Sequence, residues 1–147
     1  AVERAVDLAR ARGAKRAVLL PVSAPFHCAL MQPAAAVMAE ALAAVTVQAP
    51  SVPVVANVRA EAVTEPDRIR DLLVAQITGA VRWRESVEWM TRAGVTEFWE
   101  LGAGKALSGM VRRIAPGAGT RSIGTPGDVA AAGADADPRA GHVGNAN

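Results

Sequence analysis

The chain has no tyrosine, and its only aromatic side chains are three tryptophans and two phenylalanines among 147 residues. Proteins that bind single-stranded nucleic acid stack bases on aromatic rings, so this composition argues against that class. Positive charge is equally modest, because 16 Lys and Arg against 14 Asp and Glu leave a formal net charge of +2. The arginines are dispersed along the sequence rather than clustered. We therefore expect no nucleic-acid partner.

Cysteine occurs only once, as Cys28. A single thiol excludes an internal disulfide and a cysteine-based zinc site, and it is compatible with the reducing cytoplasm. No apolar run approaches the roughly 18 residues that a membrane-spanning helix needs. We therefore expect a cytoplasmic protein with no bound metal, no cofactor and no membrane partner.

The beginning of the chain has helical character. Residues 1–6 are amphipathic, without an initiator methionine or the layout of a signal peptide. The length suits one ordinary domain with a real core. We expect the chain to be a piece of a longer protein that starts inside a helix.

Hydrophobic periodicity predicts an alternation of helices and strands. Helical spacing covers 2–12 and Gly13 is placed to end that helix, whereas a continuous apolar run predicts a buried strand over 15–22. The other predicted elements are helices over 31–45, 67–77, 84–93 and 105–114, and strands over 52–58 and 96–101. Such alternation is typical of an α/β layered fold.

The pattern dissolves after about Pro116. Residues 125–147 are of low complexity, with repeated Ala, Gly and Asp. We expect them to form a mobile tail with at most a helical turn near 128–132.

His27 is the strongest candidate for chemistry. It lies between the apolar run and a helical segment, where Pro21 and Pro25 stiffen the backbone. A general base needs a nucleophile within reach and an acceptor for its second ring nitrogen. From local context alone, a structural histidine in a tight connection is an equally good interpretation. The neighbouring Cys28 is poorly placed to share a proton with it and is interpreted as a small buried residue.

No serine of the chain has the Gly-x-Ser-x-Gly context of a nucleophile elbow. The serines considered are Ser23, Ser51, Ser86, Ser108 and Ser122. Residues 102–105, Gly-Ala-Gly-Lys, lack the spacing of a phosphate-binding loop and predict a tight turn instead. Gln76, near the end of a predicted helix, is interpreted as a solvated residue unless an imidazole N–H donates to its carbonyl. The three tryptophans, Trp83, Trp89 and Trp99, are expected in the core.

Four segments, in order, resemble malonyl-CoA:acyl carrier protein transacylases over about residues 1–125. They are PFHCALM at 25–31, APSVPVVANV at 49–58, IRDLLVAQI at 69–77 followed by VRW at 81–83, and ELGAGKALSG at 100–109. The resemblance implies an α/β-hydrolase-like large subdomain with a ferredoxin-like insert. Residues 1–20 would be the last helix and strand of that insert, and 21–124 the C-terminal part of the large subdomain.

The resemblance also implies a two-step transfer of malonyl from CoA to the phosphopantetheine thiol of acyl carrier protein, through a serine ester. His27 matches the general base, and Gln76 matches a residue whose carbonyl can help to orient it, although a backbone carbonyl could do the same. Phe26 matches the position of a bulky residue in malonyl-specific enzymes. The nucleophilic serine, the oxyanion-hole glutamine and the arginine for the malonyl carboxylate match nothing here. We therefore expect the nucleophile to lie outside this chain and the isolated chain to be inactive.

Two other interpretations remain open at this stage. The chain could be the same portion of an acyltransferase domain from a polyketide synthase. It could also be a non-catalytic α/β module that binds or scaffolds. A serine elbow or a ketosynthase in the upstream coding sequence would distinguish these interpretations.

Overall fold

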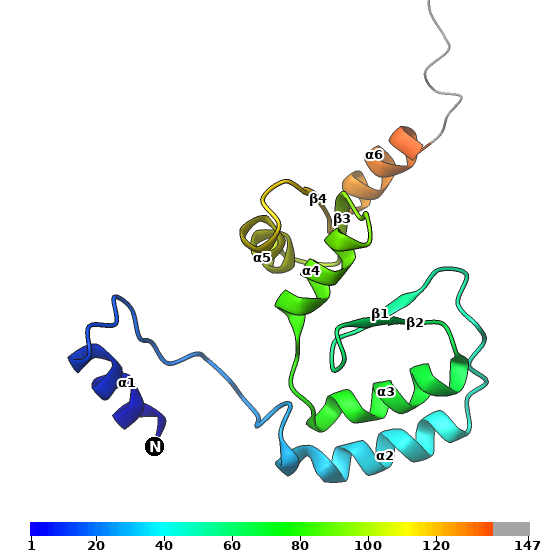
Figure 1. Cartoon of the computed structure of the whole chain (residues 1–147). Coiled ribbons are helices and arrows are strands. Elements are labelled where there is room, and N and C mark those ends of the chain that lie inside the picture. Colours follow the sequence, from blue (N-terminus) through cyan, green and yellow to red (C-terminus); the bar gives the residue numbers. More distant parts are fainter. Residues whose placement is uncertain (137–147) are drawn as a thin grey trace, which may run out of the picture.

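The computed structural model describes residues 1–136, with side chains described through residue 133. Helices and strands alternate as the sequence predicts, and the architecture is mixed α/β (Figure 1). In chain order the elements are α1 (Val2–Ala11), the 3-10 turn η1 (Ala29–Met31), α2 (Gln32–Ala43), β1 (Val54–Ala56), β2 (Glu61–Val63), α3 (Pro66–Thr78), α4 (Trp83–Arg92), β3 (Glu97–Leu101), α5 (Ala106–Ile114), β4 (Gly119–Ile123) and α6 (Pro126–Ala136). No helix within residues 1–136 is long and apolar enough to span a bilayer.

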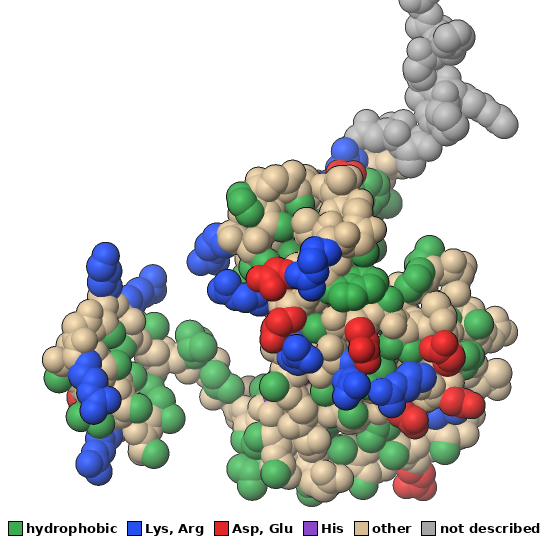
Figure 2. All heavy atoms as spheres, in the orientation of Figure 1, with side chains coloured by type: hydrophobic (Ala, Val, Ile, Leu, Met, Phe, Trp, Pro, Cys, Tyr) green, Lys and Arg blue, Asp and Glu red, His purple; other side chains and the backbone are tan. Residues whose placement is uncertain are grey.

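The amino-terminal part stands apart from the other elements (Figure 1). Helix α1 ends before Gly13, whose φ of +87° reverses the chain. The extended segment 15–22 follows, but it pairs with no strand in the described part of the chain, so the predicted buried strand is wrong here. Its apolar side chains are open to solvent, with Leu20 73% exposed, and Figure 2 shows hydrophobic side chains along this link to the rest of the chain. A strand needs a neighbour for its main-chain groups, and none lies beside this segment.

The next unit is a helix pair with a hairpin. Helices α2 and α3 pack side by side, and the antiparallel β1–β2 hairpin lies over the other side of α3 (Figure 1). Proline in the first turn of each helix fixes its start. Ala35 of α2, Leu72 of α3 and Val63 of β2 are buried in this unit. Strand β2 is so short that periodicity did not predict it.

The carboxyl-terminal unit is built on two parallel strands. Strands β3 and β4 pair from Glu97 with Gly119 to Leu101 with Ile123, and α5 connects them. The core beneath them consists of Val87, Val111 and Ala115, with five partly buried hydrophobic residues packed around it: Trp83, Met90, Phe98, Ile114 and Ala118. The sequence did not predict β4, because Gly119-Thr-Arg-Ser-Ile lacks the apolar run of a buried strand.

One tryptophan departs from its predicted place. Trp83 packs against the core as expected, but Trp99 on β3 is 45% exposed. The guanidinium of Arg121, its neighbour on β4, lies 5.0 Å from the centre of the Trp99 ring. Alternation along the strand places Trp99 on the face opposite Phe98, and a cation–π contact covers it there.

The Gly-Ala-Gly turn after β3 is a structural turn, as expected. Gly102 and Gly104 take φ values of +128° and +98°. The first turn of α5 then points its amides at Glu100, whose carboxylate accepts hydrogen bonds from the N–H groups of Leu107 at 3.0 Å and Ser108 at 2.8 Å. The chain's own carboxylate therefore holds the place that a phosphate would take at a helix N-terminus.

The segment after β4 is more ordered than its composition indicated. Helix α6 runs over Pro126–Ala136, which corrects the expectation of at most one helical turn. Asp128 Oδ2 accepts hydrogen bonds from the N–H groups of Gly124 and Thr125, which fixes the start of the helix. Alanine, the best helix former, supplies much of the remaining propensity. The rest of the predicted tail, 137–147, lies outside the described residues.

The Glu100 contacts predict a pH-dependent contribution to stability. Hydrogen bonds from the Ser108 hydroxyl and N–H, with a further one from the Leu107 N–H, hold the pKa of Glu100 below its ordinary value. A carboxyl group with a lowered pKa in the folded state contributes stability above its unfolded pKa of about 4.3, and that contribution is lost as the pH falls through the folded value. Glu100→Gln should therefore be less stable than the parent at pH 7, with a difference that shrinks towards pH 3.

Urea unfolding followed by circular dichroism at both pH values measures this difference. Glu40→Gln, on an exposed site of α2, is the matched control and should leave the urea midpoint unchanged at both pH values. An equal loss of stability for Glu100→Gln at pH 7 and pH 3 would contradict the assignment.

Candidate active site

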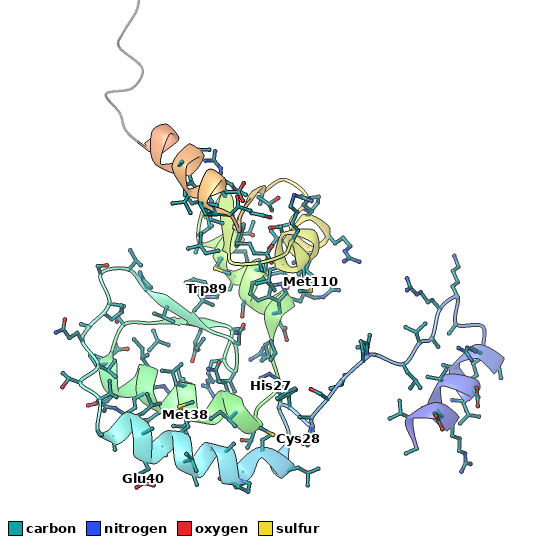
Figure 3. All side chains as sticks on the ribbon, turned by 180° about the vertical axis from the view of Figure 1, so that it is seen from behind. His27, Cys28, Met38, Glu40, Trp89 and Met110 are labelled. Carbon is teal, nitrogen blue, oxygen red and sulfur yellow. The ribbon has the colours of Figure 1, made fainter. Side chains whose placement is uncertain are left out.

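His27 lies where the extended chain reaches the α2–α3 pair (Figure 3). Its φ of +57° places it in the left-handed region, which residues other than glycine rarely occupy. The turn around it is held by the Phe26 N–H, which donates to the Ala24 carbonyl at 2.9 Å, and by the Met31 N–H, which donates to the Cys28 carbonyl at 2.9 Å. A strained backbone at a candidate catalytic residue is the kind of outlier that accompanies function.

The imidazole is fixed by one hydrogen bond from its Nδ1. That nitrogen lies 2.8 Å from the main-chain carbonyl oxygen of Gln76, in the last turn of α3. A carbonyl oxygen only accepts hydrogen bonds, so Nδ1 carries the proton and Nε2 keeps its lone pair. The ring is thereby held in the tautomer that can take a proton at Nε2.

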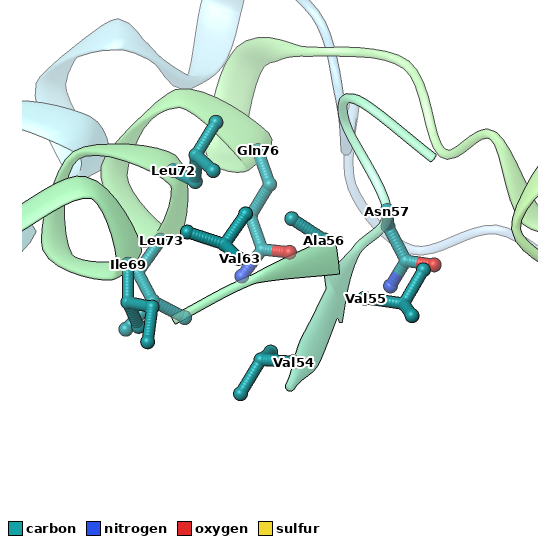
Figure 4. A pocket seen from close by; sticks show the side chains of 9 residues that line it. All are labelled: Val54, Val55, Ala56, Asn57, Val63, Ile69, Leu72, Leu73 and Gln76. Atoms are coloured by element: carbon teal, nitrogen blue, oxygen red, sulfur yellow. The ribbon is translucent and has the colours of Figure 1, made fainter. Parts of the chain in front are cut away.

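The structure brings His27 and Gln76 together, but through the main chain of Gln76. The amide side chain of Gln76 points instead towards the hairpin, where it lines a pocket between α3 and the hairpin (Figure 4). That pocket has a volume of about 180 Å³ and is lined by Val54, Val55, Ala56, Asn57, Val63, Ile69, Leu72, Leu73 and Gln76. The sequence suggested Gln76 because of its side chain. A main-chain acceptor leaves no residue-type signature, so sequence reasoning could not identify the atom.

An open apolar hollow surrounds the imidazole. Its volume is about 430 Å³, and its lining residues are Phe26, His27, Met31, Ala34, Met38, Gln76 and Ile77. None of these described lining residues carries a hydroxyl or thiol. The Phe26 ring is 57% exposed, so it stands at the hollow's edge beside the imidazole rather than in a core. The hollow therefore offers a proton acceptor and apolar walls, and a nucleophile must come from elsewhere.

Cys28 takes no part in this arrangement. Its Sγ donates to the carbonyl of Pro25 at 3.1 Å, and the residue is half-buried rather than fully buried as predicted. The thiol thus helps to close the turn in which His27 sits.

The buried serines lie in other surroundings. Ser86 donates from its hydroxyl to the Arg82 carbonyl at 2.8 Å, in the first turn of α4. The hydroxyl of Ser108 lies 2.9 Å from that of Ser122, beneath the β3–β4 sheet. Neither of these two serines lines the hollow of His27.

Comparison with known proteins gives a consistent result. No family model matches the chain. The malonyl CoA-acyl carrier protein transacylase of Escherichia coli K12 is 48% identical over 132 residues, which are 90% of this chain and 43% of that protein. The transacylase of the same name from Bacillus subtilis is 45% identical over 113 residues, 77% of this chain and 36% of that protein.

Solved structures agree with the curated relatives. The acyl-carrier-protein-S-malonyltransferase of Bartonella henselae superposes with a TM-score of 0.81 at 53% identity, over 89% of this chain and 42% of that one. A malonyl-transacylase in complex with a type II polyketide acyl-carrier protein gives a TM-score of 0.80 at 40% identity, over the same shares of the two chains.

The chain spans less than half the length of the relatives it matches. Within that span, sequence and fold agree, and the resemblance inferred from the motifs is confirmed: over about nine-tenths of its length, this chain is similar to part of the malonyl CoA-acyl carrier protein transacylases.

Proposed function

We propose that this chain supplies the general base of a malonyl transferase that moves malonyl from CoA to the phosphopantetheine thiol of acyl carrier protein. The observation that carries the proposal is the hydrogen bond between His27 Nδ1 and the Gln76 carbonyl at 2.8 Å. This bond prepares Nε2 to accept a proton within an open apolar hollow. The names of the relatives supply the substrates: malonyl-CoA and acyl carrier protein.

The nucleophile in this proposal is a serine hydroxyl outside these 147 residues. In the first half-reaction, His27 Nε2 takes the proton of that hydroxyl while its oxygen attacks the malonyl thioester. The C–S bond breaks, the imidazolium returns the proton to the CoA thiolate, and a malonyl-serine ester remains. The Nδ1–H keeps its hydrogen bond to the Gln76 carbonyl throughout. That carbonyl stabilises the imidazolium, as the acidic member of a triad does.

The second half-reaction reverses these roles. His27 Nε2 removes the proton from the phosphopantetheine thiol, whose sulfur attacks the ester carbonyl. The ester C–O bond breaks and the imidazolium protonates the serine oxygen, which restores the starting state. A half-exposed hollow suits this cycle, because two large thiol substrates must reach the same imidazole in turn.

We further assign residues 1–20 to the end of a ferredoxin-like insert and residues 21–124 to the C-terminal part of an α/β-hydrolase-like subdomain. Two features support this division. Helix α1 and the extended segment 15–22 stand apart from the α2–α3 pair (Figure 1). The parallel β3–β4 pair is typical of the larger, covered sheets of α/β proteins.

The carrier protein could belong to fatty acid or polyketide synthesis. One structural neighbour is the transacylase of a type II polyketide carrier, and its TM-score of 0.80 is close to the 0.81 of the other solved structure reported above. The geometry around His27 serves either carrier, because each presents the same phosphopantetheine thiol. A non-catalytic module would need no fixed tautomer of His27. A measurement of transferase activity therefore distinguishes this interpretation from the two acyltransferase interpretations.

The role of His27 can be tested in a chimera. Here residues 1–132 of this chain replace the matching segment of the Escherichia coli transacylase, and malonyl transfer to acyl carrier protein is measured. His27→Gln should lower kcat/KM by about 10²- to 10⁴-fold, the usual contribution of a general base. Cys28→Ser keeps the donor to Pro25 and should transfer malonyl at the parental rate.

Two outcomes would contradict the proposal. One is a chimera that stays active when His27 is replaced. The other is malonyl transfer by the 147-residue chain alone, because the nucleophilic serine would then lie within this chain. Running each assay with a fatty acid carrier and a polyketide carrier shows which one the chain serves.

Phe26 is proposed to restrict the acyl group. Its ring stands beside the imidazole at the edge of the hollow, where a 2-methyl branch on the malonyl unit would need space. In the same chimera, Phe26→Ser should raise the methylmalonyl-to-malonyl ratio of kcat/KM several-fold, because deleting the ring opens that space. Phe26→Leu keeps most of the volume and is the matched control. An unchanged ratio in Phe26→Ser would remove Phe26 from the selection of substrate.

A further inference from the structure

The Gln76 carbonyl can serve His27 only because α3 ends where it does. In a continuing helix the carbonyl of residue 76 would accept a hydrogen bond from the N–H of residue 80. Instead, the Gly79 N–H closes the last helical bond onto the Ala75 carbonyl at 3.0 Å. In the described part of the chain, no main-chain N–H donates to the Gln76 carbonyl, and the imidazole of His27 does.

Gly79 is the residue at which the helix stops. Its φ of −84° and ψ of 155° are extended, so the chain leaves the helical path there. A Cβ at this position would lie 2.6 Å from Val58 Cγ2 and 3.0 Å from the Ala75 carbonyl oxygen. Since Val58 is β-branched and the carbonyl is backbone, neither gives way easily. The site thus accepts glycine in this conformation, and a larger residue must displace the chain.

The chain beyond Gly79 is tied to the hairpin. The Arg82 N–H donates to the Asn57 carbonyl at 2.9 Å, and Arg82 Nη1 donates to the Arg59 carbonyl at 3.1 Å. These bonds pull residues 79–82 away from the axis of α3 and towards the β1–β2 turn. The end of the helix is therefore determined from both sides: by the close approach to Val58 and by the attachment of Arg82.

We propose that Gly79 is a positioning residue for His27, because it ends α3 and so leaves the Gln76 carbonyl free for the imidazole. Gly79 contacts neither substrate nor reacting atoms. It acts through a competition for one acceptor between the N–H of residue 80 and His27 Nδ1. The use of His27 in catalysis rests on the proposed function, whereas the competition itself concerns only this chain.

Replacing Gly79 by alanine should shift that competition. Alanine favours the continued helix over glycine by about fivefold in equilibrium constant. Its Cβ also opposes the extended conformation through Val58. With the Ala80 N–H on one lone pair of the Gln76 carbonyl, the hydrogen bond from His27 must share that oxygen and weakens, so the two neutral tautomers of His27 move towards the mixture of a free imidazole.

Nitrogen NMR of the ring reports this directly. The 15N-labelled 147-residue chain carries His142→Gln, so that His27 is the only imidazole. The spectrum is recorded at a pH above which the ring nitrogen shifts no longer change, so that the neutral ring is observed. The parent should show a protonated Nδ1 and an unprotonated Nε2. Gly79→Ala should move the two nitrogen shifts towards each other.

A rescue variant separates positioning from general damage. Ala80→Pro removes the competing N–H and disfavours helical conformation at residue 79. Alone, it should leave the tautomer signature unchanged. Combined with Gly79→Ala, it should restore the parental signature. A parental spectrum in Gly79→Ala, or a double variant that is not restored, would overturn the proposal.

Gly79→Asn keeps the experiment decisive if the alanine variant does not fold. Asparagine adds the same Cβ but has a lower helix propensity than alanine. It should shift the ring nitrogens in the same direction by a smaller amount, and Ala80→Pro should again reverse the shift. An asparagine variant with the parental spectrum would also overturn the proposal.

Activity in the chimera gives the second readout. Gly79→Ala should lower kcat/KM by about tenfold, with restoration by Ala80→Pro. A chimera whose malonyl transfer is unchanged by His27→Gln refutes the proposed function but leaves the NMR result standing. If the chimera is active but Gly79→Ala leaves the tautomer of His27 unchanged, only the positioning role of Gly79 is refuted.

Discussion

One hydrogen bond organises the site: the Nδ1–H of His27 on the main-chain carbonyl of Gln76. It joins a turn near the start of the chain to the end of a helix 49 positions further on. It selects one tautomer, and it helps hold His27 at a positive φ that the residue alone would avoid. The acceptor is neutral, so the imidazole gains orientation without a buried carboxylate. Everything the hollow offers to a substrate depends on this orientation.

The sequence predicted the long, strongly patterned elements well. Helices α3 and α4 match their predicted spans to within a residue or two, because proline begins α3 and a glycine follows each of them. Strands β2 and β4 were missed, since their few residues carry no hydrophobic period. The segment 15–22 shows the opposite error. Its composition is that of a buried strand, but a strand must pair with a second segment. The composition of one segment does not show whether that second segment is present.

The candidate site was predictable to the extent that it depends on side chains. His27 was identified from its motif and its place before a helix, and the structure puts it beside the predicted Gln76. The acceptor atom was beyond sequence reasoning, because every residue has a main-chain carbonyl. What makes this one available is the conformation at Gly79. The resemblance supplied the proposed chemistry of transfer, and the fold supplied the atom that orients His27.

The extended segment 15–22 has a consequence for the handling of the isolated 147-residue chain. It presents Val18, Leu19 and Leu20 to solvent with no partner strand in residues 1–136, shortly after the basic residues Lys15 and Arg16. An accessible, extended main chain is the conformation that a protease cleft admits, and apolar side chains on it attract chaperones. In a preparation of the isolated 147-residue chain, proteases are thus expected to cut first within this stretch, and a polypeptide that pairs with the stretch would protect it.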